Sequence, residues 1–175
     1  MKIKIFGGIK IFRNKIFKDY RGSFGEIYKK KFIKKNFIFN VSSSSKKKVL
    51  RGLHIQIKSP QAKFLTVIKG RIFDVALDLR KNSKTFGKYY STTLSSKKYF
   101  SSIYIPEGFA HGFCCLDKEN IVYYLTTNYR RKKNEVGIIW NDKDINIRWP
   151  IKNPIISNKD KKNLKFKEYI NRFIK

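Results

Sequence analysis

The chain has 175 residues, 41% hydrophobic and 15% aromatic, which is enough for one continuous core, and its net charge is +29. Basic residues interrupt every apolar run, so no segment reaches the roughly 18 apolar residues of a membrane span. The start of the chain, residues 1–6, lacks the apolar stretch of a signal segment. The only two cysteines are adjacent, at 114 and 115, which excludes a disulfide framework. We therefore expect one cytoplasmic domain spanning residues 1–175.

The excess of positive charge has two interpretations. A charge of this size suits a protein that binds nucleic acid or an anionic membrane surface. The lysines are spread along the whole chain, however, whereas a dedicated binder concentrates its charge and uses arginine for phosphate contacts. We expect a solvated basic surface with no membrane and no specific nucleic acid as partner. A basic nucleic-acid-binding β-barrel remains the alternative of another class.

Short runs in which apolar and polar residues alternate recur from the N-terminus onward, as is typical of half-buried strands. The predicted strands are 2–6, 9–12, 37–42, 49–57, 63–68, 71–79, 89–94, 101–105, 111–116, 121–127 and 136–140. Lys69-Gly70 predicts a tight hairpin between two of them. This many short strands in a domain of this size predict an all-β fold, either a β-sandwich or a jelly roll whose barrel mouth holds a ligand.

Helical periodicity occurs in two places, residues 25–35 and the tail 164–174. We expect the tail to form a C-terminal helix that packs on the barrel. Residues 42–48 are four serines followed by three lysines, and this low-complexity patch predicts a mobile loop.

The chain has only two histidines, His54 and His111, and each lies in a phrase that contains glycine. Imidazole exchanges protons near neutral pH, so a catalytic base is first sought here, although either ring could simply be a buried residue with one hydrogen bond. In a regular strand over 49–57, His54 and Gln56 share one face and Arg51 lies on the other. His111 follows a bend with two glycines, where backbone can approach a cavity.

Three further positions are polar within apolar surroundings. Lys63 begins the strand after Pro60, and Asp74 interrupts the apolar run 72–77. Because a buried acid is costly without a partner, we expect Asp74 to pair with a neighbour such as Lys63, Arg51 or His54, in a structural ion pair or in a site. Tyr124 is the neighbour of another tyrosine on one strand, so that one of the two rings points inward as a potential acid.

Metal binding is a separate question, because jelly-roll barrels often hold a metal with two histidines on one strand. The matching place here reads His54-Ile55-Gln56 and offers one imidazole. His54, His111 and an acid could still ligate a metal. We expect a barrel without a metal.

Ten short motifs follow one another in order along the chain: residues 19–26, 50–56, 61–63, 73–75, 78–80, 83–87, 105–113, 127–129, 139–142 and 157–160. Together they resemble the dTDP-4-dehydrorhamnose 3,5-epimerases, which are jelly-roll proteins of the cupin class. The resemblance covers about residues 12–165. It implies a single-domain cupin-like barrel with short peripheral helices, a core of about 12–160 and a C-terminal helical tail of about 161–175.

The resemblance also implies roles for the matching residues. His54 is the implied base, Asp160 the acid that orients it, and Tyr124 the proton donor on the opposite face of the sugar. Lys63 matches the lysine near the C4 carbonyl oxygen. The implied sugar-nucleotide ligands are Arg51, Gln56, His111 and Tyr129. A homodimer is implied because a second subunit completes the pocket through positions that match Arg21, Phe24, Glu26 and Asn40.

The implied activity is the conversion of dTDP-4-dehydro-6-deoxy-D-glucose to dTDP-4-dehydro-L-rhamnose, in dTDP-L-rhamnose or related deoxysugar biosynthesis, with no cofactor. An epimerase that inverts only one carbon would keep His54 and Asp160 and stays an alternative, as does a barrel that only binds a nucleotide. The sequence departs from the family pattern in two places: Gly25 replaces an aromatic residue, and the segment 161–163 is more charged than in relatives.

Overall fold

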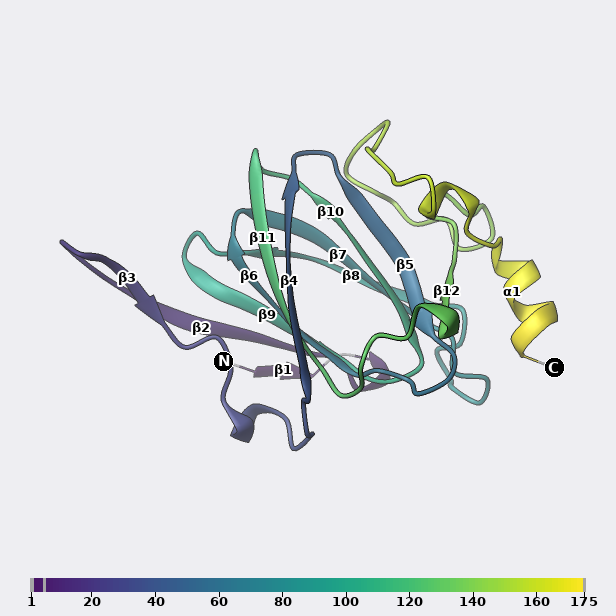
Figure 1. The fold of residues 1–175 in the computed structure, drawn as a ribbon, viewed down its shortest axis with the longest axis horizontal. Coiled ribbons are helices and arrows are strands. Elements are labelled where there is room, and N and C mark those ends of the chain that lie inside the picture. Colours follow the sequence, from purple (N-terminus) through teal and green to yellow (C-terminus); the bar gives the residue numbers. More distant parts are fainter. Residues whose placement is uncertain (1, 5, 175) are drawn as a thin grey trace.

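The computed structural model describes residues 2–4 and 6–174, and it consists of two antiparallel sheets (Figure 1). The seven-stranded sheet has the order β1 (Lys2–Lys4), β2 (Lys10–Asp19), β9 (Tyr99–Ile105), β6 (Lys63–Lys69), β11 (Glu119–Thr126) and β4 (Phe39–Lys46), with β3 (Gly22–Gly25) paired to β2. The five-stranded sheet has the order β12 (Glu135–Gly137), β5 (Leu50–Gln56), β10 (Phe109–Cys115), β7 (Arg71–Asp78) and β8 (Tyr89–Ser95). The predicted all-β jelly roll is confirmed.

Alternate residues of both sheets fill the space between them. The buried interior residues include Leu65 and Val67 of β6, Ile72 and Ala76 of β7, and Phe113 of β10. Because successive side chains of a strand point to opposite faces, each of these strands directs every second residue inward. The polar residues of the site occupy inward positions of the same strands, so the barrel interior is apolar at its centre and polar where the pocket opens.

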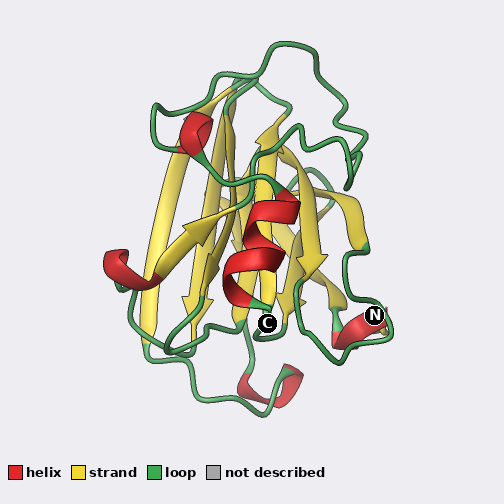
Figure 2. Cartoon of the chain, turned by 90° about the vertical axis from the view of Figure 1, so that its right-hand side faces the viewer, coloured by secondary structure: helices red, strands yellow, loops and turns green. Residues whose placement is uncertain are grey.

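The C-terminal helix packs on the outer face of the five-stranded sheet, as expected (Figure 2). Helix α1 (Phe166–Phe173) buries Tyr169 beside Leu53 of β5 and Leu77 of β7. Its start is fixed by the Phe166 amide, which donates to the carboxylate of Asp142 at 2.8 Å. The tail therefore closes the back of the sheet that carries both histidines. None of the described helices is long and apolar enough to cross a membrane.

Residues 25–35 do not form the predicted helix; their only helical turn is the 3₁₀ segment Lys30–Phe32. The apolar residues of this segment pack instead on the outer face of the seven-stranded sheet, where the Tyr28 ring lies 5.1 Å from that of Phe64 and the Phe32 ring 5.1 Å from that of Phe12. The apolar residues of segment 25–35 are therefore spaced to bury aromatic rings against a sheet and do not form the apolar face of a helix.

The serine patch is likewise not a loop. Residues 42–46 belong to β4 and pair with β11, Ser43 opposite Val122 and Lys46 opposite Glu119. Pairing with a strand that is distant in the sequence makes this segment a β-strand. The low-complexity composition of the segment does not reveal that pairing. The last predicted strand, 136–140, is also shorter than expected and ends at Gly137; residue 5 of the first lies outside the described residues.

The hairpin of β2 and β3 extends beyond the rest of the barrel (Figure 1). It exposes three large rings: Phe17 is 54% exposed, Tyr20 98% and Phe24 73%. Aromatic side chains exposed to this degree on a projecting element are typical of a surface that another molecule covers.

Candidate active site

A pocket of about 700 Å³ opens between the two sheets. Its polar lining comes from strands of both sheets and from the segment that precedes the C-terminal helix, and it includes Arg51, His54, Lys63, His111, Tyr124, Glu135 and Asp160. Apolar side chains of β4 and β10, among them Phe39, Val41 and Phe113, form the remainder of the wall. The pocket thus brings together both histidines and most of the residues that the motifs single out.

An irregularity in β5 places Arg51 and His54 in the same pocket, although alternation predicts opposite faces. His54 pairs with His111 and Arg51 with Phe113, so three steps along β5 match two along β10, which is a β-bulge. Gly52 lies in the bulge with φ of +106°, and a Cβ there would lie 2.6 Å from the carbonyl oxygen of His111. Only glycine fits this close approach of two backbones.

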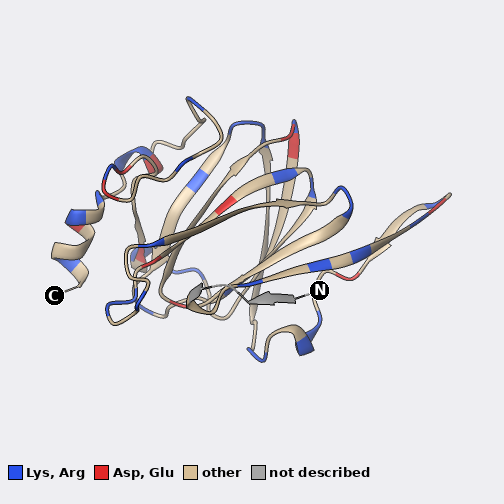
Figure 3. Cartoon of the chain, turned by 180° about the vertical axis from the view of Figure 1, so that it is seen from behind, with Lys and Arg blue, Asp and Glu red and all other residues tan. Residues whose placement is uncertain are grey.

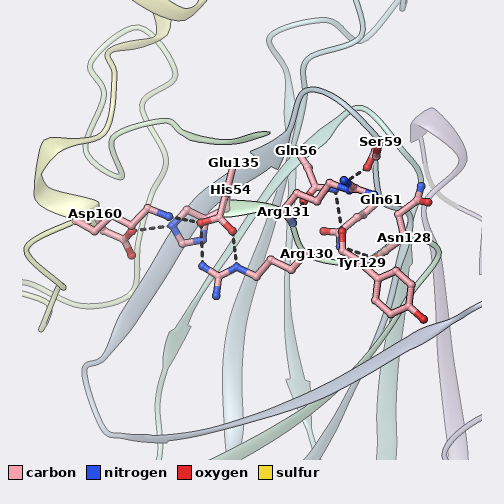
Figure 4. Close-up of polar contacts among 11 residues, drawn as sticks. His54, Gln56, Ser59, Gln61, Asn128, Tyr129, Arg130, Arg131, Glu135 and Asp160 are labelled. Carbon is pink, nitrogen blue, oxygen red and sulfur yellow. Dashed lines mark hydrogen bonds and ion pairs between the residues drawn. The ribbon is translucent and has the colours of Figure 1, made fainter. Parts of the chain in front are cut away.

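His54 is held by Asp160, which lies 106 residues away in the sequence (Figure 4). The distance between His54 Nε2 and Asp160 Oδ1 is 2.6 Å, and the other carboxylate oxygen accepts the Gly52 amide at 3.1 Å. The Asp160 side chain is 5% exposed and that of His54 25%. Although burial alone would raise the pKa of Asp160, its hydrogen bonds to His54 and Gly52 hold that pKa below its usual value.

This arrangement fixes which imidazole nitrogen can act. An ionised carboxylate only accepts hydrogen bonds, so the neutral His54 ring carries its proton on Nε2 and keeps a lone pair on Nδ1. When Nδ1 takes a proton, the charge of Asp160 stabilises the imidazolium. The pair therefore has the chemistry of a positioned general base.

Two further groups face the pocket from the seven-stranded sheet. Lys63 occupies an inward position of β6, and burial lowers its pKa to about 8 although the charges of Glu135 and Asp74 oppose this. Tyr124 is an inward residue of β11 whose ring lies 6.4 Å from that of Phe113, and burial raises the pKa of its hydroxyl. Near neutral pH the pocket thus contains a charged amine and a protonated phenol across from His54.

Asp74 has a partner, as expected, but the partner is His111 and not one of the three residues suggested as examples. His111 Nε2 lies 2.8 Å from Asp74 Oδ2, and both side chains are buried. The register of β10 and β7 puts His111 opposite Ala76, so Asp74 is its diagonal neighbour on the inward face. Burial lowers the pKa of His111, against the opposing effect of Asp74.

A cluster of three charged residues at the pocket escaped the sequence analysis. Glu135 of β12 accepts two hydrogen bonds from Arg130, at 2.7 and 3.1 Å, and pairs with Lys159. Burial alone would raise the pKa of Glu135, but the bonds from Arg130 and Lys159 lower it to about 2. Two signals were present in the sequence: Glu135 is the one acid between residues 130 and 140, and Lys159 precedes Asp160 in a motif.

No group of three or more His, Cys, Asp or Glu side chains is placed to hold a metal ion within the described part of the chain. The two buried carboxylates beside the histidines each accept from an imidazole instead.

The comparison with known proteins agrees with the motifs. The family model described as dTDP-4-dehydrorhamnose 3,5-epimerase matches residues 3–168. The chain belongs to this family. It is 44% identical over 165 residues to the dTDP-4-dehydrorhamnose 3,5-epimerase of Shigella flexneri, covering 90% of this chain and 91% of the relative. A more distant relative, 34% identical over 119 residues and covering 67% of this chain and 57% of its own, is the dTDP-4-dehydrorhamnose 3-epimerase of Streptomyces niveus.

Solved structures of the epimerase family share the fold. The dTDP-6-deoxy-D-glucose-3,5-epimerase of Legionella pneumophila, solved in complex with dTDP-4-keto-L-rhamnose, has a TM-score of 0.87 and 35% identity and covers 93% of this chain and 90% of its own. The dTDP-4-dehydrorhamnose 3,5-epimerase of Sulfolobus tokodaii has a TM-score of 0.87 and 38% identity, with 96% of each chain covered.

Two residues that the family resemblance places in the site lie outside the pocket. The Gln56 amide group is bound to backbone, donating to Ser59 at 2.6 Å and accepting from Arg131 at 2.7 Å (Figure 4). Tyr129 is 58% exposed, and its ring contacts Phe39 with centroids 5.5 Å apart. Within this chain Gln56 therefore shapes the loop that carries Arg130 and does not line the pocket.

The residues that the family resemblance assigns to a second subunit also lie away from the pocket. Arg21 and Phe24 are on the projecting hairpin, where Arg21 pairs with Asp19 at 2.7 Å. The exposed Glu26 pairs with the half-buried Lys29, and Asn40 is an exposed residue of β4. A single copy of the chain leaves all four without a role in its own pocket.

Proposed function

We propose that the chain is an epimerase that converts dTDP-4-dehydro-6-deoxy-D-glucose to dTDP-4-dehydro-L-rhamnose by inverting C3 and C5. The product feeds the synthesis of dTDP-L-rhamnose or a related deoxysugar. One observation carries the proposal: the His54–Asp160 pair, 2.6 Å apart, shares a pocket with Lys63 and Tyr124. Membership of the epimerase family supports the substrate class.

The first step in this proposal is removal of a proton by Nδ1 of His54 from the carbon next to the C4 ketone. Such a proton becomes acidic when the developing enolate oxygen is stabilised, and the ammonium of Lys63 supplies that stabilisation in the pocket. Asp160 holds the imidazole in place and compensates the charge that it gains.

The second step is delivery of a proton by Tyr124 to the opposite face of the same carbon. His54 belongs to the five-stranded sheet and Tyr124 to the seven-stranded sheet, which is the opposition that inversion needs. After one inversion His54 has gained a proton and Tyr124 has lost one, and exchange with solvent restores both. The step neither oxidises nor reduces the sugar, so the proposal includes no cofactor and no metal.

The diphosphate of the substrate has its own candidate ligands. Arg51, Arg130 and Lys159 line the pocket, and cations at a cleft attract an anionic substrate. Arg51 is fixed by a bond of 3.0 Å from its Nε to the hydroxyl of Ser45. In this proposal the basic residues at the pocket bind a small anionic substrate.

The nucleic-acid-binding alternative has its own test. Saturable, sequence-dependent binding of duplex or single-stranded nucleic acid that survives physiological salt would favour that alternative.

The proposal includes a homodimer in which the hairpin of β2 and β3 reaches the pocket of a second copy. The exposure of Tyr20 and Phe24 supports it, since burial of aromatic rings is the usual driving force at such an interface. The proposed location is the cytoplasm, where the buried free thiols of Cys114 and Cys115 stay reduced.

The test is turnover of the ketosugar nucleotide in heavy water by protein freed of metal with a chelator. We expect the product dTDP-4-dehydro-L-rhamnose with deuterium at both C3 and C5, read by NMR. Deuterium at one carbon alone would favour the single-carbon epimerase, and no exchange at either would reject the proposed reaction.

A further inference from the structure

Asp74 is a buried acid to which the proposed reaction gives no task. It lies on the inward face of β7 between Ile72 and Ala76, and the residue is 1% exposed. An acid at such a position is destabilising unless its charge is compensated, so an apolar residue would serve the core better. Its presence in the interior points to a role in the pocket.

The contacts of Asp74 are one-sided. Oδ2 lies 2.8 Å from Nε2 of His111, whereas Oδ1 is buried and has no hydrogen-bond partner among the described residues. A carboxylate that served stability alone would have both oxygens satisfied, as Asp78 does on the same strand with Arg80, Ser83 and Thr85. Asp74 therefore directs one oxygen of its negatively charged carboxylate into the barrel without a hydrogen-bond partner among the described residues.

That charge acts on three groups of the pocket that come from three different strands. It raises the pKa of Lys63 on β6 and of His111 on β10, where burial lowers the pKa. It also raises the pKa of Tyr124 on β11, where burial raises the pKa as well. Each of the three holds its proton more firmly beside the carboxylate of Asp74. For Lys63 the charge of Asp74 acts together with the larger effect of Glu135 against burial, which favours the neutral amine that cannot stabilise an enolate by charge.

We propose that Asp74 is a positioning residue of the site: it fixes the proton of His111 on Nε2 and favours the charged form of Lys63. The ring of His111 then presents its Nδ1 lone pair as an acceptor, and a hydroxyl of the sugar is the group of matching chemistry. The part that concerns Lys63 rests on the proposed function. The part that concerns His111 does not.

The first experiment uses the fact that the chain has only two imidazoles. In protein labelled with ¹⁵N-histidine, long-range ¹H–¹⁵N NMR spectra assign the protonated nitrogen of each ring, and a His54→Gln variant identifies which signals belong to His111. We expect His111 to be neutral with its proton on Nε2 between about pH 6 and 8. A proton on Nδ1 of a neutral ring would overturn the proposal, whether or not the protein turns over a sugar.

The second experiment compares Asp74→Asn with Asp117→Asn, which removes the same charge from a carboxylate bound to Arg71 at the far end of the barrel. Besides Asp74, the charged groups that act on Lys63 are Glu135 and Arg130, with His54 and His111 also in the pocket, and all of them are retained in both variants. Loss of the Asp74 charge lets Lys63 lose its proton at lower pH. We expect the basic limb of the kcat profile to move down by about one pH unit, so that kcat falls about twofold at pH 7 and about tenfold well above pH 8.

The control variant should keep the basic limb of the parent protein. If Asp74→Asn lowers kcat equally at every pH and leaves the limb in place, Asp74 acts only through the fold and the Lys63 part is rejected. If the variant does not fold, as judged by circular dichroism, the histidine spectrum of the parent protein still decides the His111 part. Absence of turnover by the parent protein would instead contradict the proposed function.

Discussion

Both oxygens of the Asp160 carboxylate are occupied, one by His54 and one by the Gly52 amide, so the imidazole has little freedom to turn. Replacement of Asp160 by Asn keeps the size of the side chain but removes its charge and allows the wrong tautomer of His54. We expect kcat to fall by ~10²- to 10⁴-fold with the fold intact, measured by steady-state kinetics and circular dichroism. A kcat within about threefold of the parent value would contradict the assigned pair.

The phenol of Tyr124 is the proposed proton donor, and its raised pKa keeps it protonated over the whole neutral range. Tyr124→Phe removes one oxygen and leaves the ring beside Phe113. We expect kcat to drop by ~10²- to 10⁴-fold while KM changes little, because the ring still fills the wall. A rise in KM with unchanged kcat would assign Tyr124 to binding alone.

The pKa of Lys63 determines how we expect the activity to change at alkaline pH. With a pKa of about 8, its ammonium is charged below that pH and neutral above it. We therefore expect kcat/KM to decline above about pH 8 in the parent protein. A Lys63→Arg variant, whose guanidinium stays charged, should lose this limb even if its activity is low. A parent profile that is flat to pH 10 would contradict the role of Lys63.

The lowered pKa of Glu135 determines how we expect the stability of the fold to change at acid pH. Its pKa is about 2 in the folded chain against 4.5 for the free side chain, so its stabilising effect is complete above pH 4.5 and is lost as the pH falls toward 2. After allowance for the half-exposed Arg130 and Lys159, we expect Glu135→Gln to cost about 2 kcal/mol at pH 6 and nothing at pH 2, measured by urea unfolding. Glu119→Gln, from an exposed pair with Lys69, should change neither value measurably.

Among the elements, the bulge in β5 has the largest effect on the site, because it directs the side chains of both Arg51 and His54 into the same pocket. Gly52→Ala places a methyl group against the His111 carbonyl, and we expect it to cost roughly 2–4 kcal/mol in unfolding free energy and to remove activity. Gly22 offers a matched control, since it has φ of +133° and nothing within 4 Å of an added Cβ. Equal costs at the two positions would show that conformation, and not the contact, decides.

The elements also show what the sequence could predict. Regular alternation predicted most of the strands, because one face of each strand is buried. It failed at β5, where one extra residue reverses the alternation between Arg51 and His54, and at residues 42–46, where pairing with β11 overrides composition. The contact of Asp160 with His54 entered only through the family resemblance, since 106 residues of chain separate them.

At the scale of the whole molecule, the barrel bears basic residues on strands, loops and helix alike (Figure 3), and the projecting hairpin of β2 and β3 exposes three aromatic rings. We expect the parent chain to sediment as a dimer in analytical ultracentrifugation. The double variant Phe17→Ser, Phe24→Ser should be a folded monomer with reduced activity, because it loses the apolar surface of the hairpin. A monomeric parent with full activity would show that the site needs no second subunit.

The most direct test of proton removal by His54 uses the His54→Gln variant. The exchange of protons at C3 and C5 of the ketosugar nucleotide with heavy water is measured by NMR for the variant and the parent protein side by side. We predict that the parent exchanges both positions and the variant neither, while the variant still binds dTDP. Exchange by the variant at the parent rate would show that another group removes the proton.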